Sequence, residues 1–284
     1  MAGTLYLVAT PIGNLEDFSP RAQRVLREVA AIACEDTRQT RKLLARFAIA
    51  TPLVSYHEHN ERRRAPELAA RLAAGESLAL VSDAGTPLLS DPGHRLVQAA
   101  LAAGAVITPI PGPAALAAAL VASGLAAAPF YFAGFLPAAP GARRKVLASW
   151  RNRGETIVFY EAPHRLIASL RDAAAELGGE RQLALARELT KLHEEFFRGT
   201  IAEALRHLEA APPRGEFTVV LAPAPAGESG APAPLSEPPS VLRMRELLAA
   251  GLSQRDALKQ AARETGQPRA TVYREWQSAG RSRS

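Results

Sequence analysis

The sequence has few of the features that would indicate a secreted, metal-binding or nucleotide-hydrolysing protein. It contains one cysteine, Cys34, which excludes both a disulfide framework and a cysteine-rich zinc site. No G-x-G-x-x-G fingerprint follows a strand-like run, and no G-x-x-x-x-G-K-[ST] phosphate-binding loop occurs. We therefore expect a protein of the reducing cytoplasm that does not hold a nucleotide in one of the common glycine-rich loops.

Charged side chains are missing from residues 96–142, and a stretch of this kind superficially suggests a membrane segment. Prolines and glycines, however, divide it into pieces too short to cross a bilayer. The longest unbroken piece, 114–128, is rich in alanine and predicts a buried helix between sheet layers. Because the N-terminus runs straight into a strand-like segment, we also expect no signal peptide.

The composition is that of a soluble globular chain with a mild preference for anions. Its 284 residues are 48% hydrophobic and 22% charged, with a formal charge of +6, and this length suits about two domains. The charge is segregated, because nine basic and four acidic side chains give residues 241–284 a charge of +5.

Strand-like runs alternate with helical patterns through residue 222, which predicts an α/β fold with largely parallel sheets. The expected strands are 5–9, 31–34, 54–56, 78–82, 105–110, 130–134, 156–160, 182–187 and 217–221. The expected helices include one that begins at Ser19-Pro20 and others at 143–153, 164–177 and 200–210. We predict two α/β/α lobes, 1–112 and 113–222, with a cleft between them, followed by a linker at 223–240 and a helical module at 241–284.

The segment VSDAGTPLLSDPG at 81–93 joins an apolar strand-like run to the next helix. Open α/β sheets bind ligands at the carboxyl ends of their strands. A turn rich in glycine and proline presents its backbone N–H and C=O groups to a small molecule without bulky side chains intervening. Asp91 and Pro92 predict a helix start, with Asp91 as the N-cap. The alternative is an ordinary strand-to-helix connection.

The basic module at 241–284 resembles a helix-turn-helix unit. Ser253 and Asp256 form a capping-box pattern, a turn follows at 265–268, and a second helix is expected at 270–276. Arg269 and Arg274 would then face phosphates, and Val272 and Trp276 would pack inward. A basic unit of this kind is suited to bind a nucleic acid. The alternative is a helical pair that aids solubility or stabilises a dimer.

Six further motifs accompany the loop at 81–93 in a fixed order. They read LVATPIGNLED at 7–17, CEDTRQT at 34–40, PGPAA at 111–115, FYEAPHR at 159–165, RELTK at 187–191 and GEFT at 215–218. Together they resemble the ribosomal RNA small subunit methyltransferase I family, a branch of the tetrapyrrole-methylase-like (class III) methyltransferases. The resemblance covers residues 4–222, and the C-terminal module also fits that family. It implies that this module binds ribosomal RNA rather than DNA.

The resemblance implies a cytoplasmic homodimer that binds S-adenosylmethionine in the cleft between the lobes. It also implies methylation of the 2′-hydroxyl of a cytidine ribose in 16S ribosomal RNA of the small subunit, near the decoding centre. The residues that it places at the cofactor are Pro11, Asp83, Ala84, Gly85, Leu88, Ala114, Ala115, Tyr160, Leu189 and Glu216. For Leu88, Ala114 and Ala115, plain core packing is an equal alternative.

The residue that accepts the hydroxyl proton is left open by the sequence. Asp36, Glu161 and Lys191 are the candidates, and each is equally well a member of a structural ion pair or a positioning contact. The other alternative is that alignment alone suffices and water takes the proton. The candidate RNA contacts are Arg38, Arg62, Arg165, Arg269 and Arg274. For Arg62, a solvated helix start is the alternative. His57-Glu58-His59 invites a metal interpretation, but no partner at a recognisable spacing supports it, so no metal is expected.

Two other functions remain open. The same fold serves methylases of tetrapyrroles or of protein side chains, against which the basic C-terminal module weighs. A regulator that binds DNA through this module and a small ligand through the lobes is the alternative outside enzymes. Nucleotide hydrolysis is disfavoured because no phosphate-binding loop or acidic metal cluster occurs.

Overall fold

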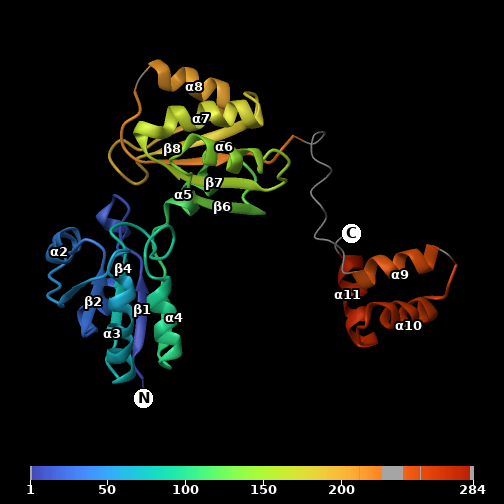
Figure 1. The fold of residues 1–284 in the computed structure, drawn as a ribbon, viewed down its shortest axis with the longest axis horizontal. Coiled ribbons are helices and arrows are strands. Elements are labelled where there is room, and N and C mark those ends of the chain that lie inside the picture. Colours follow the sequence, from blue (N-terminus) through green and yellow to red (C-terminus); the bar gives the residue numbers. More distant parts are fainter. Residues whose placement is uncertain (1, 211, 226–238, 250, 282–284) are drawn as a thin grey trace. The chain divides into compact units, whose positions relative to one another are not determined.

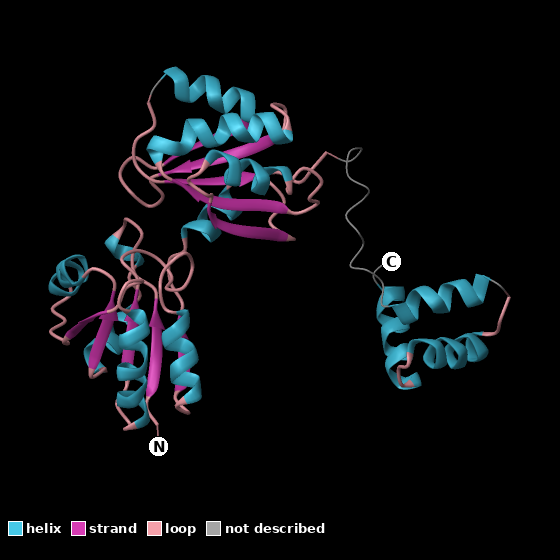
Figure 2. Ribbon diagram, in the orientation of Figure 1, coloured by secondary structure: helices cyan, strands magenta, loops and turns pink. Residues whose placement is uncertain are grey.

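The computed structural model describes residues 2–210, 212–225, 239–249 and 251–281 of the chain. These form two compact units, one within residues 1–225 and the other within 226–284. The larger unit contains two five-stranded sheets, one in each half of its sequence (Figures 1 and 2). The predicted α/β class is confirmed, whereas most of the expected linker, at 226–238, lies outside the described residues.

The first sheet has the strand order β3-β2-β4-β1-β5, and its neighbouring strands are parallel. Its strands are β1 (Thr4–Val8), β2 (Ala31–Cys34), β3 (Leu53–Ser55), β4 (Leu78–Val81) and β5 (Val106–Ile110). The helices of this lobe are α1 (Pro20–Glu28), α2 (Thr37–Arg46), α3 (Glu61–Ala73) and α4 (His94–Ala102). Since side chains alternate along a strand, Leu78 and Leu80 pack with α3 and α4, whereas Ala79 and Val81 pack with α1. Burial on both faces accounts for the continuous apolar strands of this lobe.

The second sheet corrects the expectation of largely parallel sheets. Its order is β6-β7-β10-β8-β9, and only the pair β6 and β7 is parallel. The strands are β6 (Phe130–Phe135), β7 (Thr156–Glu161), β8 (Gln182–Arg187), β9 (Glu195–Thr200) and β10 (Phe217–Leu221). Strand β9 was not predicted from the sequence. The loop at 188–194 is too short for the crossover that a parallel pair requires, so β8 and β9 form an antiparallel pair.

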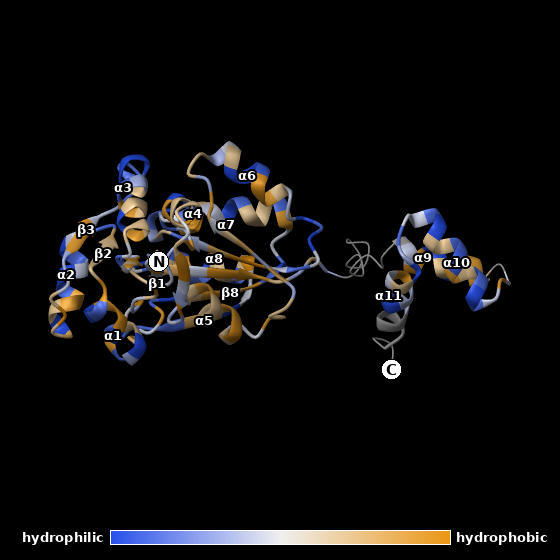
Figure 3. Cartoon of the chain, turned by 90° about the horizontal axis from the view of Figure 1, so that it is seen from below, coloured by the Kyte–Doolittle hydropathy of each residue, from blue (hydrophilic) through white to orange (hydrophobic). Residues whose placement is uncertain are grey.

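Helices cover the second sheet unequally. On one face lie α6 (Pro140–Ala148), α7 (Pro163–Leu177) and α8 (Ile201–Ala210), and on the other lies α5 (Ala115–Ala122). Figure 3 shows α5 as predominantly hydrophobic, in contrast to α1 and α2. The uncharged stretch thus divides among β5, α5, β6 and the start of α6, and no helix among the described residues is long and apolar enough to span a membrane.

The observed starts of three helices can be compared with the starts predicted from the sequence. Ser19 caps α1 as predicted, and its hydroxyl accepts a hydrogen bond from the Ala22 amide. The predicted start at Asp91 is wrong, because α4 begins at His94 after Gly93. Asp91 does not cap the helix, since Gly93 occupies the N-cap position two residues later. Helix α6 begins three residues earlier than expected, at Pro140.

The described residues of the C-terminal unit form three helices, α9 (Pro239–Ala249), α10 (Gln254–Thr265) and α11 (Arg269–Arg281). Ser253 caps α10 through the Asp256 amide, as the capping-box pattern predicted, and Gly266 ends it in the left-handed conformation. Val272 is fully buried and Trp276 packs against the same small core. Helix α9 was not separately predicted; its Met244 and Leu247 belong to this core.

Candidate active site

A cavity of about 460 Å³ lies where loops of the two lobes meet. This volume falls within the range of roughly 300–1,000 Å³ that is typical of small-molecule sites. The first lobe contributes loops at the carboxyl ends of its strands, where an open α/β sheet is expected to bind a ligand. The residues that line the cavity are Ile12, Glu35, Asp83, Ala84, Gly85, Thr86, Leu89, Ser90, Asp91, Ala114, Ala115, Phe135, Tyr160, Glu161, Ala162, Pro163, Ala186, Leu189, Glu216, Phe217 and Thr218.

Gly85 supplies room in this cavity rather than hydrogen bonds. Its amide donates to the Thr10 carbonyl at 3.0 Å, and its carbonyl accepts from the Thr10 amide at 2.9 Å and from the Ser82 hydroxyl at 3.0 Å. A Cβ added at Gly85 would lie 3.2 Å from Ile12 Cγ2, and its φ of +84° is one that side chains with a Cβ rarely adopt. Within the turn at 81–93, the backbone groups of Gly85 itself are thus already paired inside the protein.

Non-glycine residues in the left-handed conformation flank the cavity on both sides. Leu88 and Ser90 have φ values of +71° and +72° in the first lobe, and Glu188 and Thr190 have +50° and +65° in the second. Such residues carry local strain, which is retained mainly where the surrounding structure fixes a functional loop. Here the two loops are also tied to neighbours, since the Thr86 hydroxyl donates to the Pro113 carbonyl and the Thr190 hydroxyl accepts from the Asn14 amide.

The start of α5 forms one wall of the cavity. Ala114 and Ala115 line it, and the Tyr160 hydroxyl accepts a hydrogen bond from the Leu116 amide at 3.2 Å. A helix N-terminus carries a partial positive charge, which favours an anionic group such as a carboxylate. The opposite charge comes from Glu35, Asp83, Asp91 and Glu216, which also line the cavity. The site thus suits a ligand with both anionic and cationic ends.

The structure brings most of the expected cofactor residues together. Eight of them line the cavity, namely Asp83, Ala84, Gly85, Ala114, Ala115, Tyr160, Leu189 and Glu216. Pro11 and Leu88 are not among the lining residues. Leu88 instead packs against the core beneath α3 and α4, which is the packing role that the sequence left open for it.

Each proposed proton acceptor is already committed to another contact. Asp36 caps α2, and the Arg38 amide hydrogen bond, at 2.7 Å, lowers the pKa of its carboxyl. Burial lowers the pKa of Lys191, but hydrogen bonds to Glu188 and Glu216 outweigh this and raise it, so the ammonium keeps its proton. Neither Asp36 nor Lys191 lines the cavity. These two residues are therefore poor proton acceptors.

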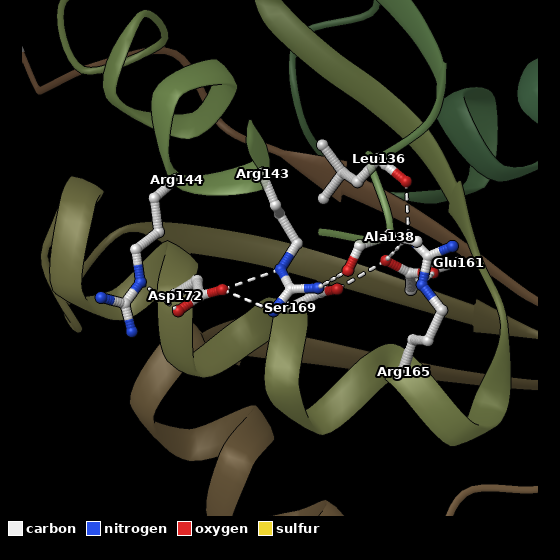
Figure 4. A network of polar contacts seen from close by, with 8 residues as sticks. All are labelled: Leu136, Ala138, Arg143, Arg144, Glu161, Arg165, Ser169 and Asp172. Carbon is white, nitrogen blue, oxygen red and sulfur yellow. Dashed lines mark hydrogen bonds and ion pairs between the residues drawn. The ribbon is translucent and has the colours of Figure 1, made fainter. Parts of the chain in front are cut away.

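Glu161, the third candidate, lines the cavity and belongs to a buried polar network (Figure 4). Its side chain is 0% exposed; it accepts hydrogen bonds from the Ser169 hydroxyl at 2.5 Å and the Ala162 amide at 3.0 Å. The Arg165 guanidinium lies 3.2 Å from Glu161 and also donates to the Leu136 carbonyl. Arg165 thus connects the end of β7 to the residue that follows β6.

A second, outer cavity of about 830 Å³ adjoins the first, and the two share Glu35, Ser90 and Asp91 as lining residues. Its remaining lining residues are Glu58, Glu61, Pro92, Gly93, His94, Arg95 and Gln98. Sequence reasoning named Asp91 as a helix cap and Glu35 as a neighbour of Asp36, and so missed both as site residues. For Asp91, a signal was present in the sequence, because it is a second acidic residue in the same loop after β4 as Asp83.

The remaining candidates lie outside both cavities. Arg38 and Arg62 are exposed, as are Arg269 and Arg274 on the C-terminal unit. The His57 ring nitrogen Nε2 lies 3.1 Å from the side-chain nitrogen of Asn60. Among the described residues, no group of three or more histidine, cysteine, aspartate or glutamate side chains is placed to hold a metal ion.

Comparison with known proteins agrees with this architecture. The family model for tetrapyrrole (corrin/porphyrin) methylases matches residues 4–205. A Synechocystis protein named ribosomal RNA small subunit methyltransferase I is 49% identical over 95% of this chain and 96% of its own length. A Thermotoga maritima protein of the same name is 47% identical and covers 77% of this chain and 98% of its own length. The fold is also that of uroporphyrin-III C-methyl transferase from Thermus thermophilus, solved with S-adenyl homocysteine, with a TM-score of 0.55 at 18% identity over 77% of this chain and 97% of that one. The chain therefore belongs to the tetrapyrrole methylase family and, within it, to the ribosomal RNA small subunit methyltransferase I family.

Proposed function

We propose that the protein methylates the 2′-hydroxyl of a cytidine ribose in 16S ribosomal RNA, near the decoding centre of the small subunit. The observation that carries the proposal is the identity of 49% over 95% of the chain to a relative named for methylation of small-subunit ribosomal RNA. The ribose hydroxyl is the acceptor that the family resemblance implies. The carboxylates between the two cavities support it, because a hydroxyl that accepts a methyl group must lose its proton.

S-adenosylmethionine is the cofactor of this reaction, and the inner cavity fits its mixed charge. The start of α5 would hold the methionine carboxylate, and Asp83 and Glu216 would face its cationic groups. Leu189 and Ala186 supply an apolar wall for the adenine. When bound, the cofactor supplies an activated methyl group, because its sulfonium sulfur is a good leaving group. The chain's own contribution is to exclude water and to align the incoming oxygen.

The outer cavity would receive the nucleotide. A carboxylate accepts a hydrogen bond from the amino group of cytosine, and Glu35 and Glu58 line this cavity. Phosphates would be held elsewhere, because the outer cavity is predominantly acidic. Arg38 and Arg62 of the first lobe and the basic C-terminal unit are the proposed phosphate contacts.

The site of methylation tests the proposal. Small subunits that lack the modification would be incubated with the protein and S-adenosylmethionine labelled in its methyl group. Label on a 2′-oxygen protects the adjacent phosphodiester from alkali, since that oxygen can no longer attack the phosphate. We expect one labelled, alkali-resistant dinucleotide that contains cytidine. Label on a base, on ribosomal protein or on an added tetrapyrrole would contradict the proposal.

Removal of residues 226–284 should weaken RNA binding and leave cofactor binding nearly intact. The length of a relative supports this prediction. The Thermotoga protein aligns over 98% of its own length but matches only 77% of this chain. Log affinity falls linearly with log salt, and each lost phosphate contact makes this slope less steep by about 0.7–0.9. Arg269→Gln and Arg274→Gln should each reduce the steepness of this slope by about the amount expected for one phosphate contact. Titrations at several salt concentrations measure the slopes; a collapse of cofactor affinity in calorimetry would contradict the modular interpretation.

We also propose that the protein is a homodimer in the cytoplasm. The large apolar side chains of Val121 and Phe130 are 76% and 45% exposed on the second lobe, and a second copy would cover such surface. Sedimentation velocity of the full chain should give the mass of a dimer, and Val121→Glu should shift the equilibrium toward the monomer. A monomer at micromolar concentration would contradict this assembly.

A further inference from the structure

Asp91 stands at the junction of the two cavities, since it lines both of them. The loop at 82–93 places it there, with Ser90 held in the left-handed conformation immediately before it. If the inner cavity holds the methyl donor and the outer one the nucleotide, the reacting oxygen must lie where they meet. Asp91, Glu35 and Ser90 are the residues that the two cavities share.

Asp91 is more buried than the other acids at this junction, although burial and the charge of Asp83 also raise the pKa of Glu35. Its side chain is half-buried, whereas Glu35 and Asp83 are exposed. Both of these carboxylates act on it electrostatically from the loops that follow β2 and β4, and Asp91 in turn acts on Tyr160 from the second lobe. The Ser82 side chain forms a hydrogen bond with it. Asp91 is therefore a carboxyl whose protonated form is unusually stable.

The pKa of Asp91 reflects this environment. Burial, followed by the negative charges of Glu35 and Asp83, raises it to about 6, although the hydrogen bond with Ser82 acts in the opposite direction. An acid with a pKa close to the working pH is ionised enough to accept a proton, yet basic enough to hold it. Asp36 has the opposite property, because the pKa of its carboxyl is lowered.

We propose that Asp91 is the general base of the methyl transfer, a role that rests on the proposed function at this same site. The hydroxyl oxygen forms a bond to the methyl carbon as the carbon–sulfur bond breaks, and that electron pair remains on sulfur. The hydroxyl proton passes to an Oδ atom of Asp91, which later releases it to water. Glu35 is a positioning residue in this scheme, because its charge keeps Asp91 basic.

The test compares Asp91→Asn, Asp91→Glu and Glu35→Gln in the full-length protein. In the wild type, the single-turnover rate should rise with pH to a plateau, with a midpoint near 6, because only the carboxylate accepts a proton. Asp91→Asn should lower the plateau by about 10²–10⁴-fold and abolish this rise. Asp91→Glu should restore part of the rate. Calorimetry should show that all three variants still bind S-adenosylmethionine.

Glu35→Gln provides the sharper readout, because it alters the base without removing it. Loss of one negative neighbour should move the midpoint of the pH profile below that of the wild type. Carboxyl NMR of the free protein labelled with ¹³C-aspartate should show the same shift, with an inflection near 6 in the wild type that is missing in Asp91→Asn. Glu209→Gln, an exposed acid-to-amide change on α8, is the matched control and should leave both curves unchanged.

The outcomes separate this inference from the proposed function. If the label is on a ribose 2′-oxygen and Asp91→Asn keeps the wild-type rate and pH profile, the base is not Asp91. If Glu35→Gln leaves the NMR inflection where it was, the electrostatic account of Asp91 is wrong. If the label is on another atom, the proposed function itself fails, whatever the behaviour of Asp91.

Discussion

Valine in place of Gly85 is expected to lower the affinity for S-adenosylmethionine by about 100-fold or more, which is roughly 2.7 kcal/mol of binding free energy. The added side chain would begin 3.2 Å from Ile12 Cγ2 and 3.7 Å from the Pro113 carbonyl oxygen, at a position that lines the cavity. A β-branched residue is also strained at a φ of +84°. The loop must then shift or the side chain must occupy the ligand's place. Isothermal titration calorimetry measures the loss.

Gly104→Val is the matched control for this variant. Gly104 has a φ of +75°, but a Cβ at this position would meet nothing within 4 Å. Both variants therefore carry the conformational strain, and only Gly85→Val obstructs the cavity. We expect Gly104→Val to be somewhat less stable than the wild type and to bind the cofactor normally. Wild-type affinity in a folded Gly85→Val protein would show that the ligand does not occupy this cavity.

Asp172→Ala is expected to lower the free energy of unfolding by about 3–5 kcal/mol. This is the usual cost of removing one partner of a buried ion pair and leaving the other charge in place. Asp172 accepts from Arg143 at 2.8 Å and from Arg144 at 2.7 Å, and the Arg143 side chain is only 6% exposed (Figure 4). The variant would leave the Arg143 guanidinium buried without its counter-charge. Chemical denaturation followed by circular dichroism measures the difference.

The pH dependence of this loss has a definite sign. Burial raises the pKa of Asp172, but hydrogen bonds from Arg144 and Arg143 outweigh it and lower the pKa below the usual value. A carboxylate with a lowered pKa stabilises the fold at neutral pH, and this contribution disappears as the pH falls through its pKa in the folded state. The difference between wild type and Asp172→Ala should therefore shrink on acidification.

Glu28→Ala is the control for Asp172→Ala, because Glu28 and its partner Arg24 are 58% and 60% exposed. An exposed pair of this kind contributes about 0–1 kcal/mol. A loss in Asp172→Ala no larger than that of Glu28→Ala would contradict the structural role of the buried pair.

The elements of the first lobe could be predicted closely because each one has a local signal. Strand β2 was placed at its observed bounds, and Ser19-Pro20 marks the start of α1 through a cap that depends on neighbouring residues alone. Strand β9 was missed, because half of it is exposed or polar and its pairing with β8 depends on residues distant in sequence. The antiparallel pairing of most strands in the second sheet was not predicted for the same reason, because it also depends on residues distant in sequence.

Site residues that lie in a recognisable motif could be predicted from the sequence. Residues that only the folded chain brings close to the site could not. Asp83, Gly85 and Tyr160 lie in motifs of the resemblance, and all of them line the cavity. Asp91 was assigned to a helix cap because Asp-Pro is a common helix start, and nothing local shows that its carboxyl faces Glu35 instead. Burial and mutual distance of acids are properties of the folded chain.

The left-handed residues on both sides of the cavity have a consequence for engineering. Ser90 and Thr190 hold backbone shapes that glycine adopts more easily, so a screen for heat resistance alone would favour change at these positions. The same changes would loosen the loops that shape the ligand's surroundings. Thermal tolerance and turnover would thus be selected in opposite directions at these positions, and a screen that scores both would be needed to retain activity.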